Sequence, residues 1–147
     1  MTTHTQSKKG EPAQSTSPVS IRHDPYPVDG PFGGIYAYGV ETKAHARILH
    51  ISGQVGEPPK GELSLEFADQ CRQAIWNVEA VLKEAGMTLS DIVKMSFFLT
   101  RPEDMRTLLE VRKELVDGVR PAITTLFVAG LMKPEWLVEV EVVASAE

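Results

Sequence analysis

The chain has 147 residues, of which 42% are hydrophobic and 24% charged, and its formal net charge is -5 at pH 7. These values fit one globular domain with a buried core, and they exclude a fibrous or wholly disordered chain. The acidic balance, without a basic stripe, argues against a nucleic-acid partner, and no apolar run approaches the roughly 20 residues of a membrane span.

The N-terminal region is polar. Residues 1–20 are rich in Ser, Thr, Lys, Gln and Pro, so burial cannot offset the entropy lost by ordering them. We expect a flexible tail over residues 1–20, without the apolar segment of a secretory signal, and a single domain over residues 21–147. The single cysteine, Cys71, lies at an apolar position of a predicted helix, so we expect a buried thiol rather than a reactive one. It cannot form an internal disulfide, which fits a cytoplasmic protein.

Two strands and a long helix are predicted in the first half of the chain. The short apolar segments 35–40 and 47–51 are separated by polar residues and predict two strands joined as a hairpin. Between residues 65 and 85 the apolar side chains recur every three or four positions, which is the period of one helix face. Gly86 follows, where a helix commonly ends.

The second half predicts one further helix and three strands. Residues 91–100 alternate in the manner of a strand with one buried face. A second amphipathic helix, ending near Gly118, carries on its stripe Met105, Leu108, Leu109, Arg112, Leu115 and Val116. The β-branched runs 123–129 and 137–144 predict the last two strands. The predicted order is therefore β-β-α-β-α-β-β.

This order predicts an α+β fold, with a mixed sheet and both helices on one face. Each helix has a single apolar stripe and needs one sheet surface to cover it. The other sheet face still carries apolar residues, among them Tyr38, Phe98, Val128 and Val140. Such a face would aggregate if it were left in water, so we expect other subunits to cover it. The residues alone predict an oligomer without fixing its size.

The sequence contains none of the common cofactor motifs. The four histidines, His4, His23, His45 and His50, have neither helical i,i+4 pairing nor cysteine partners, so we expect no metal site. A GxSxG elbow, a Walker loop and a GxGxxG turn after a strand are all missing. We therefore expect no cofactor and none of the usual serine-hydrolase or nucleotide-binding functions.

Two carboxylates interrupt the apolar pattern of the last predicted strand. Glu139 and Glu141 are two positions apart, so they share one face of the sheet at a separation of about 7 Å. Two charges in such a strand are unfavourable unless they are solvated or paired. Two interpretations remain open, a solvent-facing edge of the sheet and a carboxylate that acts as general base in a pocket between subunits.

The chain as a whole resembles the RidA/YjgF family over about residues 30–146. The resemblance rests on the segments YAYGV, ILHISGQVG, QAIWNVEAVLKEAGMTLSDIVK and RPAITTLFVAGLMKPEWLVEVEVVA in this order. It implies a chorismate-mutase-like fold and a homotrimer with a small-molecule cleft between each pair of subunits. Well-studied members hydrolyse enamines and imines in these clefts, giving 2-keto acids and ammonia.

The resemblance also assigns site residues. Tyr36 matches the family's pocket tyrosine, Ser52 and Gly53 match the Ser-Gly that lines the cleft, and Glu139 matches the carboxylate that positions water. We therefore expect Glu139 to be catalytic and the other three to bind substrate.

One departure from the family pattern affects the expected chemistry. Deaminating members have an arginine directly after Pro-Ala, which binds the substrate carboxylate through two hydrogen bonds, and this position is Ile123 here. Without that charge, a buried substrate carboxylate is left unpaired, so we expect weak or no activity on 2-iminopropionate. The positions of a family cysteine and a family asparagine are Thr125 and Leu109. Ile123 and the adjacent Thr124 remain expected members of the substrate site.

Two further residues are candidates for that site. Arg120 precedes Pro121 and either replaces the missing arginine or is a surface or interface residue. Trp136, next to the last strand, either walls the cleft or packs at a subunit interface.

Two functions follow and stay open. One is an enzyme that hydrolyses enamine or imine intermediates to keto compounds and ammonia. The alternative is a non-catalytic trimer that binds a metabolite, and it is motivated by the same missing arginine. A ribonuclease function, attached to some relatives, is disfavoured because the chain is acidic.

Overall fold

A computed structural model of the chain describes residues 19–24 and 35–147. The elements in chain order are β1 (Ser20–His23), β2 (Gly39–Thr42), β3 (Arg47–Val55), α1 (Phe67–Glu84), β4 (Ile92–Leu99), α2 (Met105–Val116), β5 (Ala122–Phe127) and β6 (Val138–Ala146), with 3-10 turns at Leu89–Asp91 and Pro102–Asp104. The tail expected over residues 1–20 lies outside the described residues, apart from Val19 and Ser20, and Ser20 begins β1.

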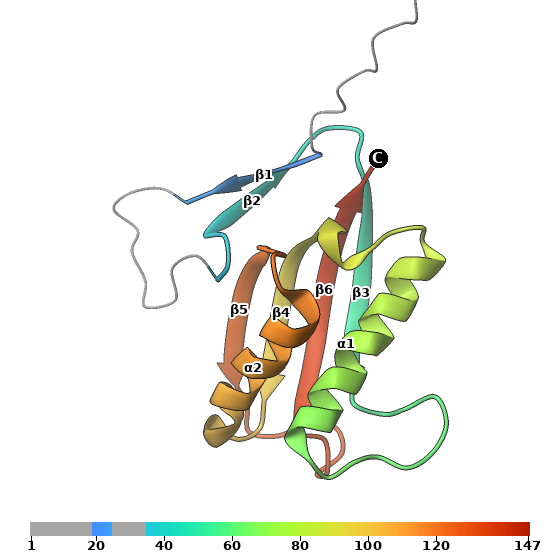
Figure 1. Ribbon diagram of the computed structural model, residues 1–147, viewed down its shortest axis with the longest axis vertical. Coiled ribbons are helices and arrows are strands. Elements are labelled where there is room, and N and C mark those ends of the chain that lie inside the picture. The colour runs from blue at the N-terminus through green and yellow to red at the C-terminus, as the bar shows by residue number, and fades with distance from the viewer. Residues whose placement is uncertain (1–18, 25–34) are drawn as a thin grey trace, which may run out of the picture.

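The main sheet has four strands in the order β3-β6-β4-β5. Strands β4 and β5 are parallel, and the other neighbouring pairs are antiparallel, so the sheet is mixed. Both helices lie on the same face of this sheet (Figure 1). The α+β class, the two helices on one face and the predicted succession of elements are confirmed, with β1 as an additional strand.

The predicted hairpin of the first two strands is wrong. Strand β2 pairs with β1, with Thr42 opposite Ser20, whereas β3 pairs with β6 along most of its length. The connection between β2 and β3 turns at His45, which has a left-handed φ of 70°. Strand β3 gains a long ladder beneath α1 by pairing with β6, and burial of Ile51 on that face adds to the gain. Strand β3 is an edge strand of the main sheet, and β2 pairs with β1 rather than adding to that sheet.

Strand β6 lies between β3 and β4, in the interior of the sheet, and its alternation decides which residues face the helices. Residues 138, 140, 142 and 144 are almost completely buried against α1 and α2. Val140, which we expected on the open face, therefore belongs to the core. Glu139 and Glu141 occupy the alternate positions on the open face, where they neighbour Phe98 and Ser96 of β4.

A buried glutamine fixes the start of β6 beneath α1. Gln70 Nε2 donates to the carbonyl oxygens of Ser64 at 2.8 Å and Glu135 at 2.9 Å. The Leu137 N–H donates to Gln70 Oε1 at 2.9 Å. The Gln70 side chain is fully buried, and its three hydrogen bonds join the loop before α1, the helix itself and the segment that enters β6. This arrangement holds the strand that carries Glu139.

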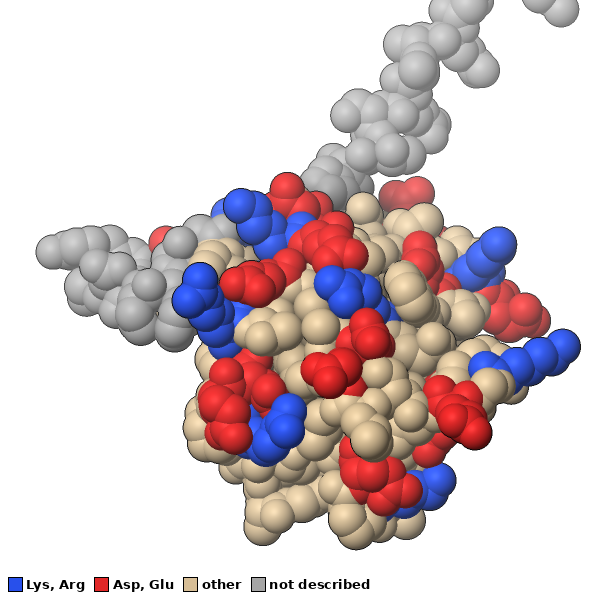
Figure 2. Space-filling view, turned by 60° about the horizontal axis from the view of Figure 1, so that its bottom comes forward, with Lys and Arg blue, Asp and Glu red and all other residues tan. Residues whose placement is uncertain are grey.

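Charged side chains of both signs are interspersed over the molecular face shown in Figure 2, without a basic patch on that face. None of the helices in the described part of the chain is long and apolar enough to cross a membrane.

Candidate functional site

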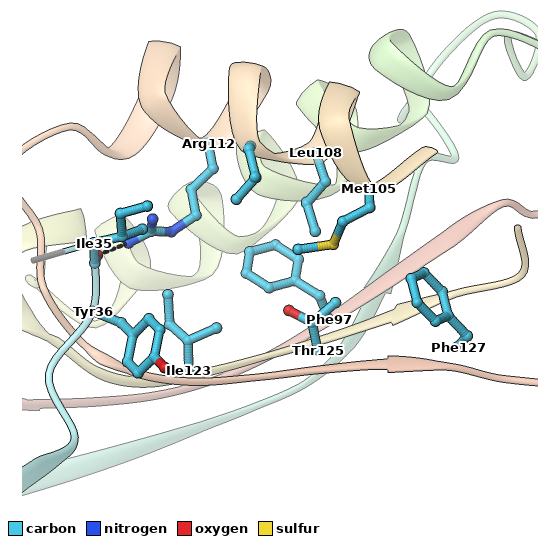
Figure 3. A pocket seen from close by; sticks show the side chains of 10 residues that line it. Ile35, Tyr36, Phe97, Met105, Leu108, Arg112, Ile123, Thr125 and Phe127 are labelled. Atoms are coloured by element: carbon cyan, nitrogen blue, oxygen red, sulfur yellow. Dashed lines mark hydrogen bonds between the residues drawn. The ribbon is translucent and has the colours of Figure 1, made fainter. Parts of the chain in front are cut away.

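A cavity of about 380 Å³ lies between α2 and the edge strand β5. Helix α2 packs against α1, and its other side stands off from β5, which leaves the space open. The cavity is largely apolar and is lined by Ile35, Tyr36, Phe97, Met105, Leu108, Leu109, Arg112, Ile123, Thr125 and Phe127 (Figure 3).

Tyr36 reaches this cavity because its neighbour is attached to β5. Ala37 forms a parallel bridge with Ala122, and its N–H donates to the Pro121 carbonyl oxygen at 3.0 Å. The bridge sets Tyr36 beside Ile123, on the wall opposite α2 (Figure 3). The structure thus brings Tyr36 and Ile123 together, with Thr125 and Leu109 on the same walls, and these are four of the positions that the resemblance compared with family residues.

Arg112 is the charged residue among those that line this cavity, and the sequence alone did not single it out as functional. It extends from α2 toward Ile35, where Nη2 donates to the main-chain carbonyl oxygen at 2.6 Å (Figure 3). The residue is buried, and this burial lowers the pKa of its guanidinium. The sequence did contain a signal for this residue, namely an arginine within an otherwise apolar helix stripe. A cation buried by such a stripe requires partners.

A second hollow, of about 300 Å³, lies on the open face of the sheet and contains Glu139 and Glu141. Gly53 lines the same hollow, at a bulge where residues 52 and 53 interrupt the pairing of β3 with β6. A Cβ atom at Gly53 would overlap Glu139 Oε1 and lie 2.7 Å from its Cδ. The absence of a side chain at residue 53 is therefore what lets the Glu139 carboxylate lie against the β3 backbone.

The structure confirms that Glu139 and Glu141 share one face of the sheet. Their strand is an interior strand, so they do not lie at an edge of the sheet, but the open face leaves Glu141 exposed to solvent in the protomer. Glu139 is partly buried and Glu141 exposed, so Glu139 is the more buried carboxylate of the two.

The two hollows share no residue and open on opposite faces of the sheet. Ile123 faces the helices beside the buried Met95, whereas Glu139 lies on the open face beside Phe98. A single protomer therefore does not bring Glu139 together with Tyr36 and Ile123.

Two other expected site residues also lie away from the cavity. Thr124 is on the open face, where its Oγ1 accepts a hydrogen bond of 2.6 Å from Lys94 Nζ. Ser52 is exposed at the β3 bulge, next to Gly53. Strand alternation explains the separation of Thr124 from Ile123, because adjacent residues point to opposite faces.

Arg120 is held by an acid. Its Nη2 donates to Asp24 Oδ2 at 2.7 Å and to the Tyr36 carbonyl oxygen at 3.4 Å. The hydrogen bond from the Tyr38 N–H and the one from Arg120 lower the pKa of the Asp24 carboxyl. Because its charge is already paired, Arg120 does not act as a free anion-binding group in this protomer.

Trp136 is held outside both hollows. Its Nε1 donates to Glu57 Oε1 at 2.8 Å, and Lys133 Nζ lies 5.0 Å from the ring centroid and 3.0 Å from the same carboxylate oxygen. The hydrogen bonds from Trp136 and Lys133 lower the pKa of Glu57. Trp136 therefore ties the segment before β6 to the loop after β3 and lines neither hollow.

Comparison with known proteins gives a consistent result. The family model described as endoribonuclease L-PSP matches residues 34–146. The Escherichia coli protein named putative reactive intermediate deaminase TdcF is 34% identical over 115 residues, which are 76% of this chain and 86% of that protein. The human 2-iminobutanoate/2-iminopropanoate deaminase is 35% identical over 100 residues, or 67% of this chain and 72% of the human protein.

Solved structures share the fold. A Rid-family protein of unknown function from Yersinia pestis, YyfB, superposes with a TM-score of 0.76 at 26% identity, covering 87% of this chain and 99% of that one. Escherichia coli TdcF with bound serine gives a TM-score of 0.65 at 31% identity, covering 78% and 90%. These likenesses confirm the fold that the sequence resemblance implied.

Proposed function

This chain belongs to the endoribonuclease L-PSP family, the RidA/YjgF superfamily, and we propose on that premise that it hydrolyses imine or enamine intermediates in clefts between subunits. The observation that carries the proposal is the Glu139 carboxylate, which lies against Gly53 in an open hollow. Relatives named as deaminases for reactive intermediates, 2-iminobutanoate or 2-iminopropanoate support the reaction class.

The proposed chemistry needs one water and one carboxylate. Glu139 accepts a proton from a water molecule while the oxygen of that water adds to the carbon of the C=N bond. The nitrogen of the former C=N bond takes up a proton. In the resulting carbinolamine, the nitrogen takes the proton held by Glu139, the C–N bond breaks to release ammonia, and the hydroxyl loses its proton as the C=O bond forms. The sum is an imine and water giving a carbonyl compound and ammonia, without any redox partner.

A cleft between subunits explains why the protomer separates its two hollows. The cavity with Tyr36 and Ile123 and the hollow with Glu139 lie on opposite faces, so a neighbouring copy has to supply one of them. The open face offers apolar surface for such a contact, since Ile48 and Leu126 are about half exposed there and Phe98 is partly exposed. The homotrimer of the RidA/YjgF family meets this need by closing a ring of three copies.

The substrate preference is expected to differ from that of relatives with the arginine. Ile123 gives a substrate carboxylate no charge at the β5 wall, so 2-iminopropionate is expected to be hydrolysed weakly or not at all. The same observation favours a second candidate function, a trimer that binds a metabolite in these clefts without turnover.

The test is an imine-hydrolysis assay. An amino-acid oxidase generates 2-iminopropionate from alanine, and the protein's rate is read from its competition with semicarbazide for the imine. We expect little activity from the unmodified protein and a higher activity from Ile123→Arg. Adding Glu139→Gln to the Ile123→Arg variant should lower that activity by about 100-fold or more. The variant Glu141→Gln is the matched control, because this carboxylate lines the same hollow.

Two results would contradict the proposal. One is an unmodified protein as active as the human deaminase assayed in parallel, with a rate that Glu139→Gln leaves unchanged. The other is an Ile123→Arg variant that folds and assembles but stays inactive on every imine tested. In that case the binding trimer becomes the supported function.

A further inference from the structure

Arg112 is a buried cation that forms no ion pair within the described part of the chain. The residue is only 8% exposed. Its Nη2 donates to the carbonyl oxygens of Ile35 at 2.6 Å and Val119 at 3.4 Å, whereas its Nε has no hydrogen-bond partner. The other buried charge among these residues, Asp104, is paired with Arg101 at 2.7 Å. Of the two, only Arg112 is left with an unneutralised charge and an unused donor.

This arrangement is unfavourable for the free protomer. A guanidinium loses its hydration on burial, and two carbonyl dipoles replace only part of it. The loss lowers the pKa of Arg112, and attraction to Asp117 offsets this in part without a direct ion pair. A hydrophobic side chain of similar volume would satisfy packing at this position on α2 without that penalty. The charge is explained if an anion completes the site.

The cavity beside Arg112 has the composition of a binding site for an amphiphilic acid. The guanidinium marks one end, and the rest of the space is walled by Phe97, Leu108 and Phe127. A volume of about 380 Å³ falls in the range of about 300–1,000 Å³ that holds complete small-molecule ligands. A three-carbon acid would leave most of this apolar space empty.

We propose that Arg112 binds the carboxylate of a monocarboxylic acid whose apolar body fills the cavity between α2 and β5. The charge then comes from the helix wall, opposite the β5 position at which other family members carry their arginine. Where the cavity also serves the proposed imine hydrolysis, the inference rests on that function and names its substrate class, imino or keto acids with a long apolar side chain.

Arg120 provides an internal comparison. It is also partly buried near the same end of α2, and its Nε lacks a partner. Its charge is neutralised by Asp24, and it does not line the cavity. Arg120 is therefore an enclosed arginine whose charge is already paired. Arg112 differs from it in having an unpaired charge and in lining the cavity.

The test uses the full chain, with hexanoate and its neutral isostere hexanamide as probes, and isothermal titration calorimetry as the readout. We expect the unmodified protein to bind hexanoate at least about tenfold more tightly than hexanamide, a difference of about 1.4 kcal/mol. Arg112→Gln should bind the two probes within about twofold of each other, and Arg120→Gln should keep the preference. A purely structural role for Arg112 would lower both affinities together and leave their ratio unchanged.

Three results would overturn the inference: equal affinity of the unmodified protein for the two probes, binding of neither at millimolar concentration, or a preference that survives in Arg112→Gln. Should Arg112→Gln not fold, arginine side-chain resonances of the ¹⁵N-labelled unmodified protein replace it. Hexanoate should shift one Nε–H resonance that hexanamide leaves in place, and unshifted resonances would equally overturn the inference. The titration measures binding and needs no turnover. A failure of this inference can therefore be told apart from a failure of the proposed imine hydrolysis.

Discussion

A side chain at residue 53 and the carboxylate of Glu139 would occupy the same space. A Cβ atom on Gly53 would overlap Oε1 and lie 2.7 Å from Cδ of that glutamate. The carboxylate is the end of a flexible side chain on the open face of the sheet, so it is the group that would move.

Gly53→Ala is therefore expected to displace the carboxylate without unfolding the chain. In the Ile123→Arg background, imine hydrolysis should fall by at least about tenfold, because misplacing a general base removes much of its effect. Gly130→Ala is the control, since a Cβ atom there would meet nothing within 4 Å although the residue lines the same hollow. Equal activity of the two variants would show that the contact between Gly53 and Glu139 is not needed.

Gln70→Leu is expected to destabilise the protein. It leaves the carbonyl oxygens of Ser64 and Glu135 and the N–H of Leu137 without their buried partner. At about 1 kcal/mol for each group, the free energy of unfolding should fall by about 3 kcal/mol in urea at fixed protein concentration. Gln73→Leu, which removes one side-chain bond to Asn77, should cost less than about 1 kcal/mol. A loss of the same size in both variants would contradict the assigned role of Gln70.

Cys71 should resist thiol reagents while the protein is folded. Burial raises the pKa of this thiol to about 12, so almost none of the reactive thiolate exists at about pH 8. We expect negligible reaction with a disulfide reagent at that pH and complete reaction in denaturant. The pKa of the Cys71 thiol is higher in the folded than in the unfolded chain. The protonated thiol therefore contributes its full stabilisation below about pH 9, and this stabilisation declines as the pH rises toward 12. Rapid labelling of the native protein would contradict the burial of α1's inner face.

Leu126→Lys is expected to weaken self-association. Leu126 lies on the open sheet face and Trp76 on the exposed side of α1, and both are 48% exposed. Sedimentation equilibrium should show a trimer for the unmodified protein and for Trp76→Lys. The association constant of Leu126→Lys should be lower by at least about tenfold, since a charge would be buried against apolar surface. A stable lone protomer of the unmodified protein would contradict the subunit arrangement.

Periodicity predicted most of the fold, because it reports which face of each element is buried. The alternation of residues 91–100 and the helical stripe over residues 65–85 correspond to β4 and α1. Periodicity does not identify the partner of a strand, which is why β2 and β3 were wrongly paired. Val140 was misplaced although Glu139 and Glu141 already fixed the phase of β6.

The candidate site was less accessible from sequence. The resemblance supplied Tyr36, Gly53 and Glu139, but the division of these residues between two sheet faces depends on tertiary packing. Arg112 interrupts the apolar stripe of α2, which is a signal of a buried cation, but the cavity that it lines is seen only in the structure. Long-range contacts, such as the one between Arg112 and the Ile35 carbonyl, leave no local pattern.

The most direct test of a site completed between copies is subunit mixing. One partner is the unmodified protein, which has Glu139 but no arginine at position 123, and the other is the double variant Ile123→Arg, Glu139→Gln. Neither alone should hydrolyse 2-iminopropionate efficiently. After joint refolding of equal amounts, a cleft is complete where an arginine of the variant meets Glu139 of the other partner, in about one cleft of four. We predict that the mixture regains about a quarter of the activity of Ile123→Arg, and a mixture no more active than its two components would contradict the account.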